Sequence, residues 1–240
     1  MLEVQLFNTC LAEQFFPAAI EATVKVLEAL KLKVRPMRRA FCCGQAPFNE
    51  GLRAEALGLA RNFLGAALPG MPIVVPSGSC AAMIRNFYRD LLADEPASLK
   101  QAAALQPWVF ELGQFIVNVM KVKYLGARFD HTVAYHPSCH LARELRAADD
   151  TRVLLANVNG LKLVDFRNPE ECCGFGGMFA VKFPALSTAM AQDKLERIRE
   201  SAAELLVAND CGCLMQLGGL SHRNHLGLEV RHVAEVLAAR

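Results

Sequence analysis

Eight of the nine cysteines form two sets with almost the same spacing. The sets are Cys10, Cys42, Cys43 and Cys80, and Cys139, Cys172, Cys173 and Cys213. Equivalent members are 129 to 133 residues apart, and each set contains an adjacent pair followed by glycine. Several thiolates around one point, commonly four, are the ligands of an iron–sulfur cluster. The pattern therefore predicts two metal–sulfur sites, one in each copy of a duplicated chain.

The residues next to the cysteine pairs favour this chemistry. Gly44 and Gly174 follow the pairs, and glycine permits a positive φ and leaves an N–H free to bond sulfur. His136, three residues before Cys139, could donate to cluster sulfur, move protons or bind metal. His140 has the same options with less support, and Arg38 and Arg39 would balance cluster charge or face solvent.

Two other uses of the cysteines stay open on the residues alone. Structural zinc sites usually pair knuckles of the form C-x₂₋₄-C, whereas these spacings are long and the paired cysteines are adjacent. A disulfide between adjacent cysteines departs from ordinary disulfide geometry, although it could act as a thiol switch. Cys211 lies outside the repeat and suits an inert buried cysteine.

The elements between the cysteines predict an α/β fold. Helical spacing of apolar residues appears over 18–30, 52–68 and 185–200, with Pro184 in the first turn of the last. Short apolar runs such as "PIVV" and "LLVA" are typical of buried parallel strands. Each copy closes on an apolar stretch, 108–120 or 230–240, that we expect to be helical. We predict two similar halves, 1–125 and 126–240, related by a pseudo-twofold axis, each a mainly parallel sheet flanked by helices.

Charge and hydrophobicity limit which partners and which cellular compartment we expect. A net charge of +2 over 240 residues gives no electrostatic case for nucleic acid. The sequence contains no run of 18 apolar residues and no signal peptide at its start, so we expect no transmembrane segment and a cytoplasmic protein. Cysteines in a reducing compartment suggest metal or redox chemistry before structural disulfides.

The motifs "FCCGQAPFNEG", "YHPSCH" and "ECCGFGGMFAVKFP" resemble the cysteine-rich CCG domain, in duplicate. That family includes heterodisulfide reductase B subunits and the iron–sulfur subunits of glycolate oxidase and anaerobic glycerol-3-phosphate dehydrogenase; the likeness is strongest to its lactate-utilization proteins. The resemblance implies an oxidoreductase subunit that transfers electrons in a cytosolic complex converting L-lactate to pyruvate, acting only with two other lactate-utilization proteins. It also implies two [4Fe-4S] clusters, which aerobic preparations would lose or replace with zinc.

The sequence departs from the family pattern at the last cysteine of each copy. The full motif ends in C-x-x-C, but Ser77 and Asp210 stand at the earlier position, with Cys211 one place later. Ser77 and Asp210 would be weak oxygen ligands or helix N-caps, and we expect caps. A disulfide-reductase-like subunit and a structural metal-binding module remain the alternative functions.

Overall fold

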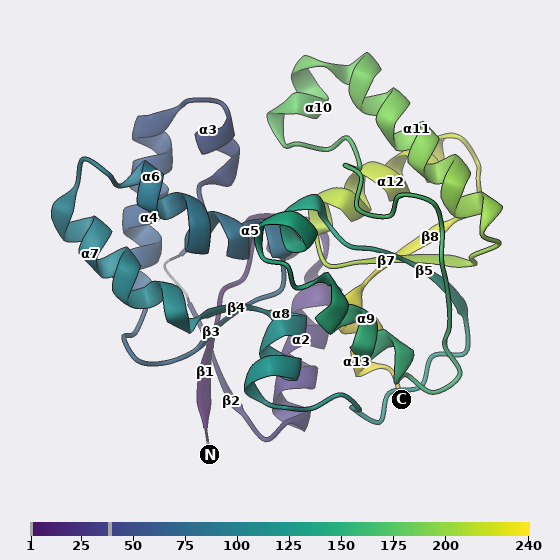
Figure 1. The fold of residues 1–240 in the computed structure, drawn as a ribbon, viewed down its shortest axis with the longest axis horizontal. Coiled ribbons are helices and arrows are strands. Elements are labelled where there is room, and N and C mark those ends of the chain that lie inside the picture. Colours follow the sequence, from purple (N-terminus) through teal and green to yellow (C-terminus); the bar gives the residue numbers. More distant parts are fainter. Residues whose placement is uncertain (1, 38–39) are drawn as a thin grey trace.

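The computed structural model describes residues 2–37 and 40–240, so Arg38 and Arg39 lie outside the described residues. It contains two four-stranded parallel sheets with the same strand order, β2-β1-β3-β4 and β6-β5-β7-β8 (Figure 1). The strands are β1 (Glu3–Leu6), β2 (Lys33–Pro36), β3 (Ile73–Val75), β4 (Val109–Glu111), β5 (Thr132–His136), β6 (Lys162–Val164), β7 (Leu205–Ala208) and β8 (Glu229–His232). The predicted fold of two similar α/β halves is confirmed.

Helices connect the strands in both halves. In the first half they are α1 (Cys10–Phe15), α2 (Pro17–Ala29), α3 (Gln45–Asn49), α4 (Arg53–Ala66), α5 (Gly78–Ala82), α6 (Tyr88–Leu91), α7 (Pro96–Leu105) and α8 (Leu112–Gln114). In the second they are α9 (Ala148–Ala156), α10 (Met178–Lys182), α11 (Pro184–Glu200), α12 (Cys211–Arg223) and α13 (Val233–Ala238). Single π-helical turns span Met83–Phe87, Phe115–Val119 and His140–Glu144, and a 3₁₀ turn spans Gln106–Trp108.

The strongest sequence patterns gave the right elements. The three predicted helices correspond to α2, α4 and α11. Proline opens α2 and α11, because the missing N–H costs nothing in the first helical turn. All residues of β3 and β7 are buried, as their apolar runs predicted.

The prediction for the two closing stretches was wrong in part, because each begins as a strand. Residues of β4 and β8 pair with β3 and β7, and the helices start only after Glu111 and His232. Both polar side chains cap the helix that follows: Glu111 accepts from the N–H of Gly113, and His232 from that of Ala234. A short apolar run cannot by itself separate a strand from a helix, so only these caps mark the boundary.

The two halves share one core. Val26 and Leu27 of α2 pack with Val236 and Leu237 of α13, in a cluster that also contains residues of both sheets. A further core cluster belongs to each half. The halves therefore form one body. In each half, the carboxyl ends of the strands are directed toward the other half.

The strand order brings the ends of particular strands together. In each sheet the first two strands in the sequence occupy one side and the last two the other. The two central strands are followed by connections that lead to opposite edges of the sheet. The crevice at the carboxyl ends of these two strands is a topological switch point, where α/β folds bind ligands. β1 and β3 form this crevice in the first half, and β5 and β7 form it in the second.

Within residues 2–37 and 40–240, the helices are all too short or too polar to cross a membrane.

A candidate metal–sulfur centre

Both switch points open into one cavity between the halves. Its volume is about 290 Å³, and all nine cysteines line it. Cys10 begins α1 after β1, and Cys80 lies in the first turn of α5 after β3. Cys139 follows β5, and Cys213 lies in the first turn of α12 after β7. All four cysteines therefore stand just after a strand, where a helix or a helical turn begins.

The first set forms two sulfur pairs. The Sγ atoms of Cys10 and Cys42 are 3.8 Å apart, and those of Cys43 and Cys80 are 3.3 Å apart. The N–H of Gly44 donates to the Sγ of Cys42 at 3.4 Å. The structure therefore brings all four members to one edge of the first sheet.

The second set repeats this arrangement. The Sγ atoms of Cys173 and Cys213 are 3.1 Å apart, and Cys139 and Cys172 lie close enough to shift the pKa of each other's thiol. The N–H of Gly174 donates to the Sγ of Cys172 at 3.3 Å, as Gly44 does in the first set. The two halves thus build the same four-sulfur arrangement independently.

The thiols do not share one protonation behaviour. The bond from the Cys10 thiol lowers the pKa of Cys42, and the bond from Cys139 lowers that of Cys172. The same bonds raise the pKa values of the donors, Cys10 and Cys139. In each set the neighbouring thiol therefore favours the thiolate form of the first adjacent cysteine, which is the form that binds metal.

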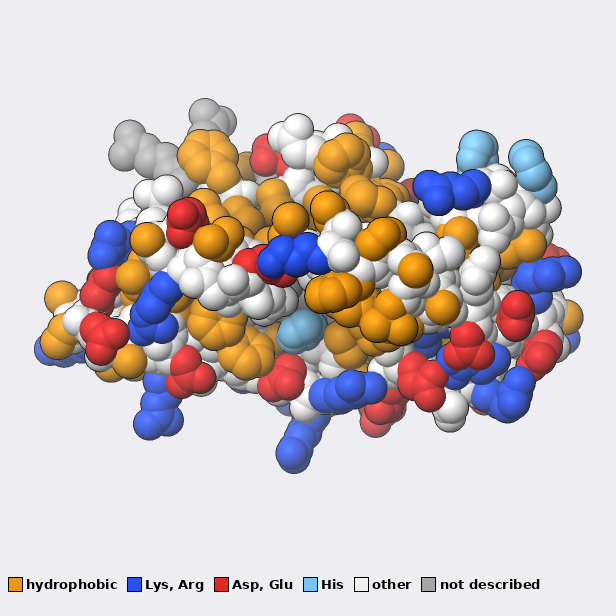
Figure 2. Space-filling view, turned by 90° about the horizontal axis from the view of Figure 1, so that it is seen from above, with side chains coloured by type: hydrophobic (Ala, Val, Ile, Leu, Met, Phe, Trp, Pro, Cys, Tyr) orange, Lys and Arg blue, Asp and Glu red, His pale blue; other side chains and the backbone are white. Residues whose placement is uncertain are grey.

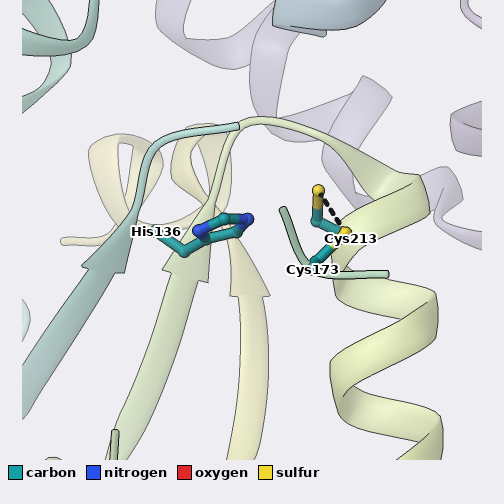
Figure 3. Close-up of side chains that lie close together, drawn as sticks. All are labelled: His136, Cys173 and Cys213. Atoms are coloured by element: carbon teal, nitrogen blue, oxygen red, sulfur yellow. Dashed lines mark hydrogen bonds between the residues drawn. The ribbon is translucent and has the colours of Figure 1, made fainter. Parts of the chain in front are cut away.

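His136 lies beside the second set (Figure 3). One of its ring nitrogens and the Sγ atoms of Cys173 and Cys213 lie within 4.8 Å of one another. Nδ1 is 2.9 Å from the carbonyl oxygen of Pro169, which can only accept, so Nδ1 carries the hydrogen. Nε2 is buried and without a hydrogen-bond partner, and a bare ring nitrogen of this kind can bind metal or accept a proton.

Lys194 of α11 was missed by sequence reasoning. The side chain is fully buried, and Nζ donates to the carbonyl oxygens of Pro169 at 3.1 Å and Asn168 at 3.4 Å. Burial lowers the pKa of Lys194 to about 8. A signal did exist in the sequence: Lys194 falls among Ala191, Leu195 and Ile198 on the apolar face of the helix.

Ser77 and Asp210 join the halves between the two sets. Ser77 is the N-cap of α5 and accepts from the N–H of Cys80, so the cap prediction for Ser77 is confirmed. Asp210 stands at the N-cap position of α12 but makes no side-chain bond to that helix. Its carboxylate instead accepts from Ser77 Oγ at 2.6 Å and from the N–H of Ser79 at 3.1 Å. The prediction that Asp210 caps its own helix was wrong, because it caps α5 of the other half.

The other candidates also lie at this site. His140 has Nδ1 3.6 Å from the Sγ of Cys139 and Nε2 3.2 Å from Nε2 of Gln45 in the first half. Cys211 lines the cavity as a buried thiol whose pKa is raised by burial. It is therefore placed with the second set, although it lies outside the repeat.

Gly44 and Gly174 have the positive φ values of +83° and +87° that only glycine adopts easily. The loops pass close to the following helix: a Cβ on Gly44 would lie 3.3 Å from the Ala56 carbonyl oxygen, and one on Gly174 only 2.5 Å from that of Ser187. The turn aims the two backbone N–H groups at the Sγ atoms of Cys42 and Cys172.

The donor set fits an anionic metal–sulfur group. Two sets of four thiols converge, each with a backbone N–H directed at sulfur. Beside the second set, Nε2 of His136 has no hydrogen-bond partner among the described residues, and none of the ion pairs that these residues form includes the buried ammonium of Lys194. A single ion held by His136, Cys173 and Cys213 would leave two members of that set unused.

Exposed apolar side chains lie near the cavity. α10 and the start of α11 follow directly from Gly176 and Gly177, which line it. Met178, Val181, Phe183 and Leu186 in these helices are 40 to 69% exposed. Figure 2 shows apolar side chains gathered on the face seen from above Figure 1.

Comparisons with known proteins agree with this site. The family model described as "Cysteine-rich domain" (CCG) matches residues 4–85 and 133–218. Lactate utilization protein A of Shouchella clausii is 42% identical, and that of Bacillus pumilus 39%, each over all of both chains. A crystal structure of a hypothetical protein from Helicobacter pylori shares the fold with a TM-score of 0.63 at 13% identity, covering 98% of this chain and 48% of that one. The chain therefore belongs to the cysteine-rich CCG domain family, in the group of the lactate utilization A proteins.

Proposed function

We propose that the protein is the iron–sulfur electron-transfer component of an L-lactate-oxidising complex, with one [4Fe-4S] cluster on each cysteine set. The observation that carries the proposal is the convergence of both sets on one cavity between the halves. Cys10, Cys42, Cys43 and Cys80 would bind the first cluster, and Cys139, Cys172, Cys173 and Cys213 the second. A bound cluster would supply one-electron transfer.

The chain's own residues would each have a defined part. The N–H groups of Gly44 and Gly174 already donate to sulfur and would stabilise thiolate charge. Nε2 of His136 would bind metal or accept a proton at the second site. Walls formed by both halves would keep most of the sulfur away from water.

Lactate as the substrate comes from the printed name of the relatives, lactate utilization protein A. Removal of hydrogen from a hydroxy acid needs a hydride or electron-pair acceptor, and "CCGFGG" does not match the G-x-G-x-x-G dinucleotide motif. We therefore propose that two other lactate-utilization proteins of the cytoplasm complete the reaction, with this chain passing the electrons.

The exposed apolar residues of α10 and the start of α11 are the surface we assign to one of these partners, because this segment follows directly from Gly176 and Gly177, which line the cavity. Val181→Asp should weaken binding of the partner in a pull-down with purified proteins. Leu2→Asp is the matched control, since Leu2 is 68% exposed and lies at the other end of the molecule, by the N-terminus in Figure 1.

Metal analysis of anaerobically purified protein tests the proposal. Two [4Fe-4S] clusters predict about eight iron and eight sulfide per chain, with an EPR signal on reduction. Cys43→Ser and Cys173→Ser should each remove about half of the iron. Cys211→Ser is the control and should keep it all, because the first set has Gly78 at that position. Stoichiometric zinc without iron or sulfide would instead favour the structural module, for which the His136, Cys173 and Cys213 cluster is the supporting observation.

A further inference from the structure

Two pairs of equivalent residues differ in polarity between the halves. The register of the strands makes Phe7 of the first half equivalent to His136 of the second: Leu6 pairs with Val74, and Tyr135 with Val207. Gly44 faces Ala56 and Leu59 in α4, where Gly174 faces Ser187 and Met190 in α11. Counting on by the same offset makes Phe63 equivalent to Lys194.

In the first half these positions form an apolar wall. Phe7 and Phe63 are fully buried, and their rings meet edge to face with centroids 5.1 Å apart. Phe63 also packs against Tyr88, whose hydroxyl donates to the carbonyl oxygen of Cys43. Among the residues that the structure describes, this wall is formed by aromatic side chains without formal charge.

In the second half the same positions form a polar, charged wall. Lys194 and His136 both donate to the carbonyl oxygen of Pro169, at 3.1 and 2.9 Å. The ammonium therefore lies near the second set, because the carbonyl oxygen that it shares with His136 holds a ring that has a nitrogen within 4.8 Å of the Sγ atoms of Cys173 and Cys213. None of the ion pairs formed by the described residues includes Lys194, and its helical neighbour Arg197 is paired with Glu171 and Asp193.

The Lys194 ammonium contacts two carbonyl oxygens and lies 5.4 Å from the centroid of the Phe166 ring. A buried ammonium with such neutral partners is costly unless an anion lies near it. A cluster bound by four thiolates carries net negative charge and gains more on reduction. A fixed positive charge beside it therefore stabilises the reduced form more than the oxidised form, which raises the reduction potential. The aromatic wall of the first half gives no such stabilisation.

We propose that Lys194 holds the second cluster at a higher reduction potential than the first, so that electrons move from the first set to the second. The inference rests on the proposed function. In the step, the reduced first cluster loses one electron and the oxidised second cluster gains it, with no bond made or broken and no proton moved. Lys194 is in this sense a tuning residue, which acts on the cluster through its charge.

A redox titration of the anaerobic, cluster-loaded protein, followed by EPR, tests this. Cys43→Ser and Cys173→Ser, each retaining one cluster, assign the two steps of the wild type. We expect the second cluster to be reduced first. Lys194→Gln keeps a donor for the Pro169 carbonyl but removes the charge, and should lower the second cluster's reduction equilibrium constant at least tenfold, about 59 mV for one electron.

Two variants separate charge from packing. Lys194→Arg keeps the charge and should keep the second potential near that of the wild type. Phe63→Leu, at the equivalent position of the first half, should leave both potentials unchanged. Equal midpoints in the wild type, no shift in Lys194→Gln, or an equal shift of both steps would overturn the inference. Absence of iron and sulfide from the wild type would overturn the proposed function itself, so the two failures are distinguishable.

Discussion

Ser77 and Asp210 occupy equivalent positions in the two halves and bond to each other across the interface, with Ser77 Oγ donating to Asp210 Oδ1 at 2.6 Å. Both replace a cysteine of the family motif. The Asp210 carboxylate also accepts from the Ser79 backbone, and both residues line the shared cavity. The relationship makes these two positions a clasp between the cysteine sets.

Asp210→Asn should destabilise the protein, because the buried carboxylate receives charge-assisted bonds from Ser77 and Ser79. We expect the free energy of unfolding to fall by about 2 kcal/mol, measured by urea denaturation. Asp165→Asn is the control: Asp165 is 87% exposed in its pair with Arg152, so its loss should cost less than about 1 kcal/mol. Equal effects of the two changes would show that the clasp adds no stability.

Glu111 predicts a pH dependence. Burial raises the pKa of this carboxyl to about 7 from its ordinary value of 4.5, although Asn209 and the N–H groups of Gly113 and Gln114 oppose the rise. The folded state then binds more protons than the unfolded state between these pH values. The contribution of Glu111 to stability is therefore complete below pH 4.5 and is lost as the pH rises through 7, up to about 3 kcal/mol.

The measurement is urea denaturation of the wild type and Glu111→Gln across pH 4.5 to 7.5. Other groups titrate in this range in both proteins, so the difference between the two curves isolates Glu111. The advantage of the wild type over the variant should shrink as the pH rises. A constant difference would mean that Glu111 titrates normally in the folded protein.

Alanine at the two CCG glycines should have unequal effects. At both positions a positive φ costs about 1–2 kcal/mol for a residue with a Cβ. At Gly174 the added Cβ would also lie 2.5 Å from a backbone oxygen, against 3.3 Å at Gly44, so Gly174→Ala should cost more. Thermal unfolding compares the pair directly, and a larger loss in Gly44→Ala would contradict the packing argument.

The two cysteine sets should differ in their effect on activity. Cys173→Ser should abolish lactate-dependent electron flow in the reconstituted three-protein complex, whereas Cys43→Ser should leave part of it. The reason is that only the second set has His136 and Lys194 beside it. The assay is anaerobic reduction of a dye, with circular dichroism to check the fold. Equal losses would remove the functional asymmetry, and full activity in both would remove the clusters from the electron path.

The sequence alone determined the duplication, the α/β class and most of the long helices. These follow from local patterns: apolar residues at helical spacing, short buried runs, and proline at the start of α11. The nine cysteines and the two CCG turns were also visible in the sequence. The glycine after each pair indicates a positive φ, which glycine adopts more easily than any other residue. β4 and β8 were missed, since strands of three or four residues are too short to show a period of their own.

Only the tertiary structure decided that the two cysteine sets face one cavity. Each switch point gathers cysteines of one half, but the packing of α2 on α13 sets how the halves meet. That packing brings the Asp210 carboxylate to the first turn of α5 in the other half. Asp210 therefore links the two halves instead of capping its own helix. The packing is a sum of many non-directional apolar contacts, which no single motif encodes. The burial of Lys194 beside the second set has the same origin: the chain supplies the residue, and long-range packing supplies its environment.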